Sequence, residues 1–178
     1  KDYMINLMKT NNIDVKIFDA LTPENTPKEY LYTNNYLSKD SNLNNGRIYC
    51  HMSHIAVLKD MVKNNYKIFF IFEDDIDSSD FNRENINYLD TILKNLPNDY
   101  DIFYLGKCWD IKNKNIIVND YITKPYKPFC RHAYGVSNEG ARKLIKYTLP
   151  MNNKPGDNLY TELIKKNIIN AYSSYDQV

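Results

Sequence analysis

Three consecutive acids, Glu73, Asp74 and Asp75, follow directly on the apolar segment 68–72. In an extended chain, Glu73 and Asp75 point to one side and Asp74 points to the other. Two carboxylates on one side, two positions apart, can hold Mn²⁺ or Mg²⁺ and leave coordination positions open for diphosphate oxygens. We therefore predict a divalent-metal site formed by Asp75 and Glu73, with Asp74 close by. A solvated acidic loop is the alternative that this pattern leaves open.

The segment 68–72 is apolar at every position, which predicts a strand buried on both faces of a sheet. Such a sheet carries helices on both sides. The acids would then stand at the carboxyl end of this strand, where open α/β sheets bind their ligands.

A second interpretation of the acids is phosphoryl transfer. Residues 75–79 are similar to the aspartyl-phosphate motif of haloacid-dehalogenase-type phosphatases, with Asp75 as nucleophile and Asp77 as general acid. That family also needs a late pair of acids, which residues 156–161 do not supply. An EF-hand loop from Asp75 is excluded, because its sixth residue is Asp80 instead of Gly and its twelfth is Ile86 instead of Glu.

Each of the three histidines has a structural and a functional interpretation. His51 and His54 are three positions apart on a predicted helix and can share one face. Helical zinc sites more often use a spacing of four, so we expect one surface histidine and one that is hydrogen-bonded inside. His132 precedes a predicted strand, at an edge where a metal or phosphate ligand would also lie.

Asp157 follows Pro155 and Gly156 at the start of a predicted helix. An acid in this position commonly caps the helix or interacts with its dipole. It could equally serve as a general base that accepts a proton from an attacking hydroxyl.

Composition narrows the classes of protein. The chain has 178 residues, 43% of them apolar and 25% charged, which fits one soluble domain. A net charge of +1 gives no argument for nucleic acid or an anionic membrane, and no apolar run reaches the ~18 residues of a membrane span. The three cysteines are far apart and form no CxxC pair, so we expect neither a disulfide framework nor a zinc ribbon. We expect a cytoplasmic location, or a secretory lumen if a leader has been removed.

Hydrophobic periodicity predicts alternating strands and helices, and hence an α/β fold with a mostly parallel central sheet flanked by helices. Residues 21–45 are rich in Pro, Asn, Ser and Thr, which predicts a long loop that closes over the ligand. The predicted helices are 2–12, 46–64, 83–95, 138–147 and 155–167. The predicted strands are 15–18, 68–72, 101–105 (broken at Gly106), 116–118, 133–136 and 171–172. Ser137 is the predicted N-cap of the fourth helix.

Taken in order, these elements resemble glycosyltransferase family 25. This family includes bacterial lipopolysaccharide and lipooligosaccharide galactosyltransferases and animal collagen galactosyltransferases. The motifs that carry the likeness are Gly46-Arg47-Ile48-Tyr49-Cys50-His51-Met52-Ser53-His54, Phe72-Glu73-Asp74-Asp75-Ile76, Asp101-Ile102-Phe103-Tyr104-Leu105-Gly106, His132-Ala133-Tyr134-Gly135-Val136-Ser137 with Gly140-Ala141-Arg142-Lys143-Leu144, and Asp157.

The resemblance implies a GT-A-like nucleotide-diphospho-sugar transferase fold and a metal-dependent, inverting hexosyltransferase. The donor would be a UDP-sugar carrying galactose or glucose, the metal Mn²⁺ or Mg²⁺, and the acceptor a hydroxyl on a glycan or protein. Asp157 would be the catalytic base, Asp75, Glu73 and Asp74 the metal residues. The predicted donor-binding residues are Gly106, His132, Ser53 and His54, with Gly106 letting the backbone approach the donor.

Two positions depart from the family pattern. Residues 3–13 match the helix that follows the family's first strand, so we expect that strand to be missing from residues 1–178. We predict that these residues form one domain, shortened at its N-terminus and its C-terminus. Gly156 stands where the family usually has Val between Pro and Asp. A non-catalytic, transferase-like binding domain is therefore a third hypothesis.

Overall fold

The computed structural model describes residues 2–76 and 83–175. Its centre is a six-stranded sheet in the order β1-β5-β2-β6-β4-β3. The strands are β1 (Ile68–Phe72), β2 (Ile102–Cys108), β3 (Ile116–Ile117), β4 (Ile122–Lys124), β5 (Phe129–Ser137) and β6 (Ala171–Ser174). Strand β5 lies between β1 and β2 and runs antiparallel to both, whereas β6 is parallel to β2.

The prediction of a mostly parallel sheet is wrong. Of the strand pairs in the described residues, only β2 and β6 are parallel, since β4 is antiparallel to both β6 and β3. Parallel neighbours need a long crossover connection, usually a helix, whereas antiparallel neighbours do not. The chain from β2 to β5 carries only a 3-10 turn (Lys112–Lys114) and the short hairpin β3–β4, so β5 returns antiparallel.

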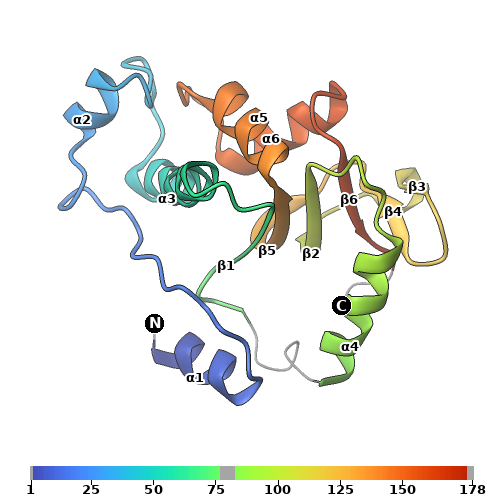
Figure 1. The fold of residues 1–178 in the computed structure, drawn as a ribbon. Helices are drawn as coiled ribbons and strands as arrows, with labels where there is room; N and C mark the ends of the chain where they lie inside the picture. Colours follow the sequence, from blue (N-terminus) through green and yellow to red (C-terminus); the bar gives the residue numbers. More distant parts are fainter. Residues whose placement is uncertain (1, 77–82, 176–178) are drawn as a thin grey trace.

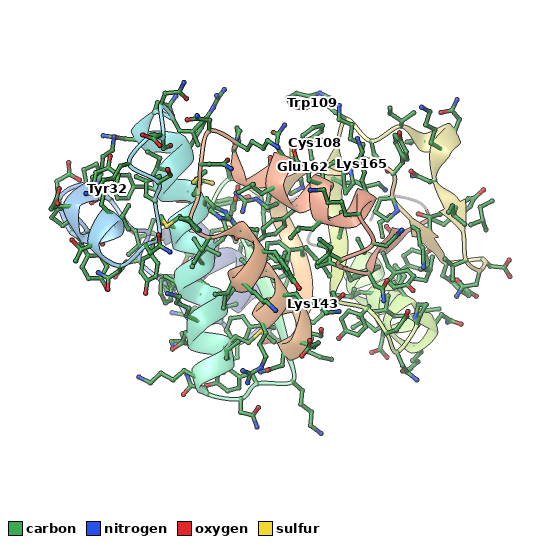
Figure 2. All side chains as sticks on the ribbon, turned by 90° about the horizontal axis from the view of Figure 1, so that it is seen from above. Tyr32, Cys108, Trp109, Lys143, Glu162 and Lys165 are labelled. Atoms are coloured by element: carbon green, nitrogen blue, oxygen red, sulfur yellow. A yellow bond between two sulfur atoms is a disulfide. The ribbon has the colours of Figure 1, made fainter. Side chains whose placement is uncertain are left out.

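The strand directions bring the carboxyl ends of β1 and β2 and the amino end of β5 to the same end of the sheet, where these strands begin or finish. Because β5 is antiparallel to both β1 and β2, the carboxyl ends of β1 and β2 flank its amino end. Figure 2 shows Cys108, the last residue of β2, well apart from Lys143, which binds Asp101 just before β2 with an Nζ to Oδ2 distance of 2.8 Å. The acids that follow β1 therefore lie at the Cys108 end.

Helices cover both faces of the sheet (Figure 1). Helices α3 (Asn45–Lys63), α5 (Asn138–Thr148) and α6 (Gly156–Lys165) form one layer, and α1 (Asp2–Thr10) and α4 (Arg83–Asn95) lie on the opposite face. The largest core cluster joins strand side chains such as Tyr104 and Tyr134 to Leu58 of α3, Leu144 of α5 and Tyr160 of α6. On the other face, Met8 of α1 packs with Ala133, and Ile92 of α4 packs with Phe103.

Two helix starts follow from local chemistry. The Asn44 side chain accepts a hydrogen bond from the Arg47 N–H at 3.0 Å, and the Ser137 hydroxyl accepts one from the Gly140 N–H at 3.0 Å. Both satisfy an N–H group that a helix leaves unpaired in its first turn. The predicted Ser137 cap is confirmed, and the helices predicted over 2–12, 46–64, 83–95, 138–147 and 155–167 are all present within a few residues.

Two predictions for the N-terminal part of the chain are wrong. Residues 15–18 form no strand, and Ile17 and Phe18 are exposed. Residues 21–45 are not one long loop, because they contain α2 (Lys28–Thr33) and bury Leu31, Leu37 and Leu43 against α3 and the segment before α6. Sparse apolar residues anchor this segment, and composition alone could not show where they dock.

Strand β1 is an edge strand instead of a fully covered one. Ile71 is buried, but Ile68 is half exposed, so the prediction of burial on both faces is wrong. Periodicity reports apolar character, and the position of a strand within its sheet depends on pairing with distant segments.

Within the described residues, no helix has the length and apolar character needed to cross a membrane. Asp77, the second acid of the phosphatase interpretation, lies outside the described residues.

Candidate active site

A cavity of about 450 Å³ opens at the edge where β1 and β2 end. It is lined by residues from five segments, namely α3, the stretch after β1, the end of β2, the start of β5 and the start of α6. The lining residues are Cys50, Glu73, Asp75, Ile76, Cys108, Cys130, Arg131, His132 and Asp157. The structure therefore brings four of the sequence-predicted residues, Glu73, Asp75, His132 and Asp157, around one space.

A bulge in the β2–β5 ladder shapes this cavity. The flanking register pairs are Gly106 with Ala133 and Cys108 with Phe129. Residues 130–132 of β5 therefore stand opposite Lys107 alone. Extra residues in one strand bend it and re-aim its side chains. Cys130 adopts a left-handed backbone with φ of 63°, and the strand predicted to break at Gly106 instead continues through it to Cys108.

Arg131 and Asp157 form a close ion pair inside the cavity. Nε of Arg131 donates to Oδ1 of Asp157 at 2.6 Å, and the Cys130 N–H donates to Oδ2 at 3.2 Å. The Arg131 side chain is only 4% exposed, so its charge depends on this carboxylate for compensation. The Asp157 carboxylate therefore binds residues of β5. The interpretation as a helix cap had instead predicted that it would interact with the first turn of its own helix.

Gly156 is the residue that makes room for this pair. A Cβ atom at that position would lie 2.6 Å from Nη2 of Arg131 and 2.7 Å from Nδ1 of His51. Both distances are far below ordinary contact, and both groups are buried. The glycine that departs from the family pattern thus fits the buried arginine and histidine beside it.

Glu73 is held by a chain of hydrogen bonds that starts in the core. Nε2 of His54 lies 2.7 Å from Oε1 of Glu73, and the Tyr134 hydroxyl lies 3.0 Å from Nδ1 of His54. Burial lowers the pKa of His54, and the hydrogen bond from His54 lowers the pKa of Glu73. Together these shifts give a neutral His54 that donates from Nε2 to an ionised Glu73 and accepts from Tyr134 at Nδ1. The backbone N–H of Glu73 also donates to the His132 carbonyl at 2.7 Å.

His51 is also buried, so the expectation of one surface histidine is wrong. Burial, reinforced by the Arg131 charge, holds the pKa of His51 well below its usual value. Nη1 of Arg131 lies 3.3 Å from Nδ1 of His51, which must accept because a guanidinium can only donate. The imidazole is therefore neutral with its proton on Nε2.

The other predicted residues lie beside the cavity or away from it. Asp74 does not line it, as the alternation of Glu73, Asp74 and Asp75 predicts. Gly106 lies under the His132 ring, where a Cβ atom would overlap Nε2, so the space left by the glycine is filled by His132. The Ser53 hydroxyl accepts from the Leu21 N–H at 2.9 Å and donates to the Tyr49 carbonyl at 2.7 Å. It anchors the segment before α2.

Residues 21–45 supply no lining residue, so the predicted closing loop is not over this cavity in the structure. These residues are all described. Several of them instead line a second, more apolar space on another face of α3, with Tyr36, Met52 and Lys59 among its walls.

A single disulfide, which the sequence did not predict, joins Cys108 and Cys130, whose Cα atoms lie 5.6 Å apart. They are 22 positions apart, and only the antiparallel return of β5 makes them neighbours.

Sequence reasoning also missed Arg131. Residue 131 lies before the strand predicted over 133–136, so the sequence did not show that this cation is buried and requires a buried acid. Nothing local indicated that Asp157 was that acid.

Comparison of the sequence with known proteins shows the family to which the chain belongs. Residues 1–160 match the model of "Glycosyltransferase family 25 (LPS biosynthesis protein)". The chain belongs to glycosyltransferase family 25. It is also 25% identical over 142 residues to procollagen galactosyltransferase 1-A of Xenopus laevis, and 26% identical over 142 residues to procollagen galactosyltransferase 1-B of the same species. Each match covers 75% of this chain but only 22% of the relative, so the chain corresponds to about a fifth of those proteins.

Proposed function

We propose that this chain transfers a hexose, galactose or glucose, from a UDP-sugar to a hydroxyl group of a glycan or protein, with inversion at the anomeric carbon. The observation that carries the proposal is the convergence of Glu73, Asp75, His132 and Asp157 on one cavity at the strand ends. Family membership and the likeness to galactosyltransferases support the reaction class.

The donor set fits a hard divalent cation. Glu73 and Asp75 both line the cavity, and carboxylate oxygens are ligands that Mn²⁺ and Mg²⁺ prefer. Oε1 of Glu73 is bound to His54, which fixes the carboxylate and leaves Oε2 available. A cation held by these residues would neutralise the charge that develops on the departing diphosphate.

In this proposal Asp157 accepts the proton of the attacking hydroxyl. As the hydroxyl oxygen bonds to the anomeric carbon, the bond from that carbon to the diphosphate oxygen breaks and its electron pair leaves with UDP. Arg131 and the Cys130 N–H each bind one Asp157 oxygen and fix the orientation of the carboxylate. Each oxygen keeps a further lone pair that can accept the proton.

His132 supplies a ring at the cavity wall, next to Glu73 and close to the expected position of the phosphates. We assign it a donor-binding role, with Gly106 allowing its ring to lie against β2. His54 acts indirectly, because its ring is buried and it reaches the cavity only through Glu73.

Nucleotide release from a panel of UDP- and GDP-sugars, with and without Mn²⁺, tests the proposal. We expect Mn²⁺-dependent release of UDP by the wild-type chain and loss of the signal in Asp75→Asn. Asp40→Asn is the matched control, since Asp40 is an exposed acid outside the cavity and should leave the rate unchanged. Full activity of Asp75→Asn would remove the metal assignment.

The same assay separates the alternative functions. A phosphatase with Asp75 as nucleophile would release inorganic phosphate and would be trapped by a metal fluoride as an aspartyl-phosphate analogue. A non-catalytic domain would bind the donor without releasing nucleotide.

A further inference from the structure

Cys108, Cys130 and His132 form a second cluster of ligand atoms in the cavity wall. Both Sγ atoms and one imidazole nitrogen lie within 4.8 Å of one another, and all three residues are half-buried. They come from the last residue of β2 and the bulged start of β5, so the backbone holds them at fixed positions.

The histidine of this cluster is accommodated by the fold and is not used by other side chains. Its ring lies against Gly106, where any larger residue would collide with Nε2. Among the hydrogen bonds of the described residues none involves this ring, in contrast to His51 and His54. The imidazole ring is thus held in place by the fold, and its nitrogens are not used in these hydrogen bonds. Together with two cysteines, such a ring makes up the ligand set of a site for a soft metal ion.

We propose that Cys108, Cys130 and His132 bind a divalent ion of the zinc type when their disulfide is reduced. They release it when a peroxide takes two electrons from the two thiolates, which re-forms the disulfide while the oxygen–oxygen bond breaks to two hydroxide ions. Zinc bonds of about 2.3 Å to sulfur and 2.0–2.1 Å to nitrogen place tetrahedral ligands roughly 3.5–4 Å apart, which the 4.8 Å cluster accommodates. The fourth position would be open to water or to a carboxylate of the cavity. Thiolate and imidazole ligands select zinc over manganese, so this cluster differs in its metal preference from the carboxylate pair Glu73 and Asp75.

A competing cluster, Cys50, His54 and Glu73, is less suited to a metal. Its atoms also lie within 4.8 Å of one another. However, both nitrogens of His54 are engaged, by Glu73 at 2.7 Å and by Tyr134 at 3.0 Å. The Arg131 guanidinium lies 3.6 Å from the Cys50 sulfur, so a bound cation would face a fixed positive charge.

Opening the site requires a two-electron reductant. A phosphine donates two electrons to the sulfur–sulfur bond and becomes a phosphine oxide with the oxygen of one water molecule, whose two protons end on the two thiols. Each thiol then loses its proton to the buffer as its sulfur bonds to the metal.

Cobalt(II) is a suitable probe, because thiolate ligation gives it strong ultraviolet charge-transfer bands and tetrahedral ligation gives visible bands. The chain also has a single tryptophan, Trp109, next to Cys108, so cobalt bound there should quench its fluorescence. We expect phosphine-reduced protein to bind Co²⁺ at least about 100-fold more tightly than oxidised protein. Zn²⁺ should displace the cobalt, and Mn²⁺ should not.

Variants locate the site. Cys130→Ser should abolish the charge-transfer bands, and His132→Ala should weaken binding by about tenfold or more. Cys50→Ser, the matched control, should keep both the bands and the quenching. Circular dichroism of each reduced variant checks the fold, and the oxidised wild-type chain provides a comparison that needs no substitution. Loss of the bands in Cys50→Ser, their persistence in Cys130→Ser, equal binding by oxidised protein, or no binding by the reduced chain would each overturn the proposal.

Discussion

Nε of Arg131 lies 2.6 Å from Oδ1 of Asp157, although the two residues are 26 positions apart in the chain. The contact joins the bulge of β5 to the first turn of α6 and connects a buried cation to the proposed base. It therefore couples the stability of the fold to the geometry of the cavity.

This coupling can be measured by a double-mutant cycle. Because Arg131 is nearly inaccessible, Arg131→Met should lower the free energy of unfolding by about 2–4 kcal/mol. Combined with Asp157→Asn, the interaction energy should be about 1–3 kcal/mol in urea titrations. The exposed pair Lys94 and Asp90 is the control, and Lys94→Met should change stability by less than about 0.5 kcal/mol. Equal effects at the two sites would contradict the burial argument.

Metal affinity should separate the three acids. We expect Asp75→Asn to weaken Mn²⁺ binding by at least about tenfold, and Asp74→Asn to weaken it less, because Asp75 lines the cavity and Asp74 does not. His54→Gln should also weaken binding by about tenfold, since the ring orients Glu73. Electron paramagnetic resonance of free Mn²⁺ gives the affinities. A larger loss in Asp74→Asn than in Asp75→Asn would assign the ligands differently.

Lowering the pH should reduce the free energy of unfolding before the pH is low enough to protonate the carboxylates. The pKa values of His51 and His54 are lowered in the folded chain, chiefly by burial, so the unfolded chain binds more protons below about pH 6.5. Stability is then fully present above pH 6.5 and is lost as the pH falls. Between pH 7.5 and 5.5 we expect a loss of about 1 kcal/mol for each histidine.

Gly106, beside the site, and Gly140, at the opposite end of β2, give a matched pair of variants. In Gly106→Ala the new methyl group meets the far end of the His132 side chain, so the ring should move and stability should fall by only about 1 kcal/mol, while donor binding weakens. In Gly140→Ala the methyl group meets the Asp101 backbone carbonyl, which cannot move freely. We expect a loss of about 3 kcal/mol there. Thermal unfolding and donor titration distinguish the two effects.

The predicted loss of stability between pH 7.5 and 5.5 can be divided between His51 and His54 by a single substitution. His51→Asn should remove about half of the dependence in urea titrations at several pH values, leaving the part due to His54. An unchanged dependence would mean that His51 does not titrate as a buried neutral imidazole.

Local features of the sequence anticipated local features of the structure. Asn44 and Ser137 cap helices because a side-chain oxygen reaches an N–H group three residues later. Glu73 and Asp75 share one side because successive side chains alternate. Such statements depend only on residues close together in the chain.

Other features depended on which strands become neighbours. The orientation of β5, the bulge at residues 130–132 and the Cys108–Cys130 pair all follow from one antiparallel return that periodicity does not encode. The burial of His51 follows from the packing of α3 against α5 and α6.

By itself, the sequence determined five of the helices, the acids at the end of β1, the α/β class and the family. Only the tertiary structure decided that Asp157 faces Arg131, that Gly106 holds the His132 ring, and that two distant cysteines meet at the cavity. The physical reason is that hydrogen bonds within a turn or a helix are set by nearby residues. Strand order and buried charge pairing, in contrast, are set by the free energy of the whole packed core.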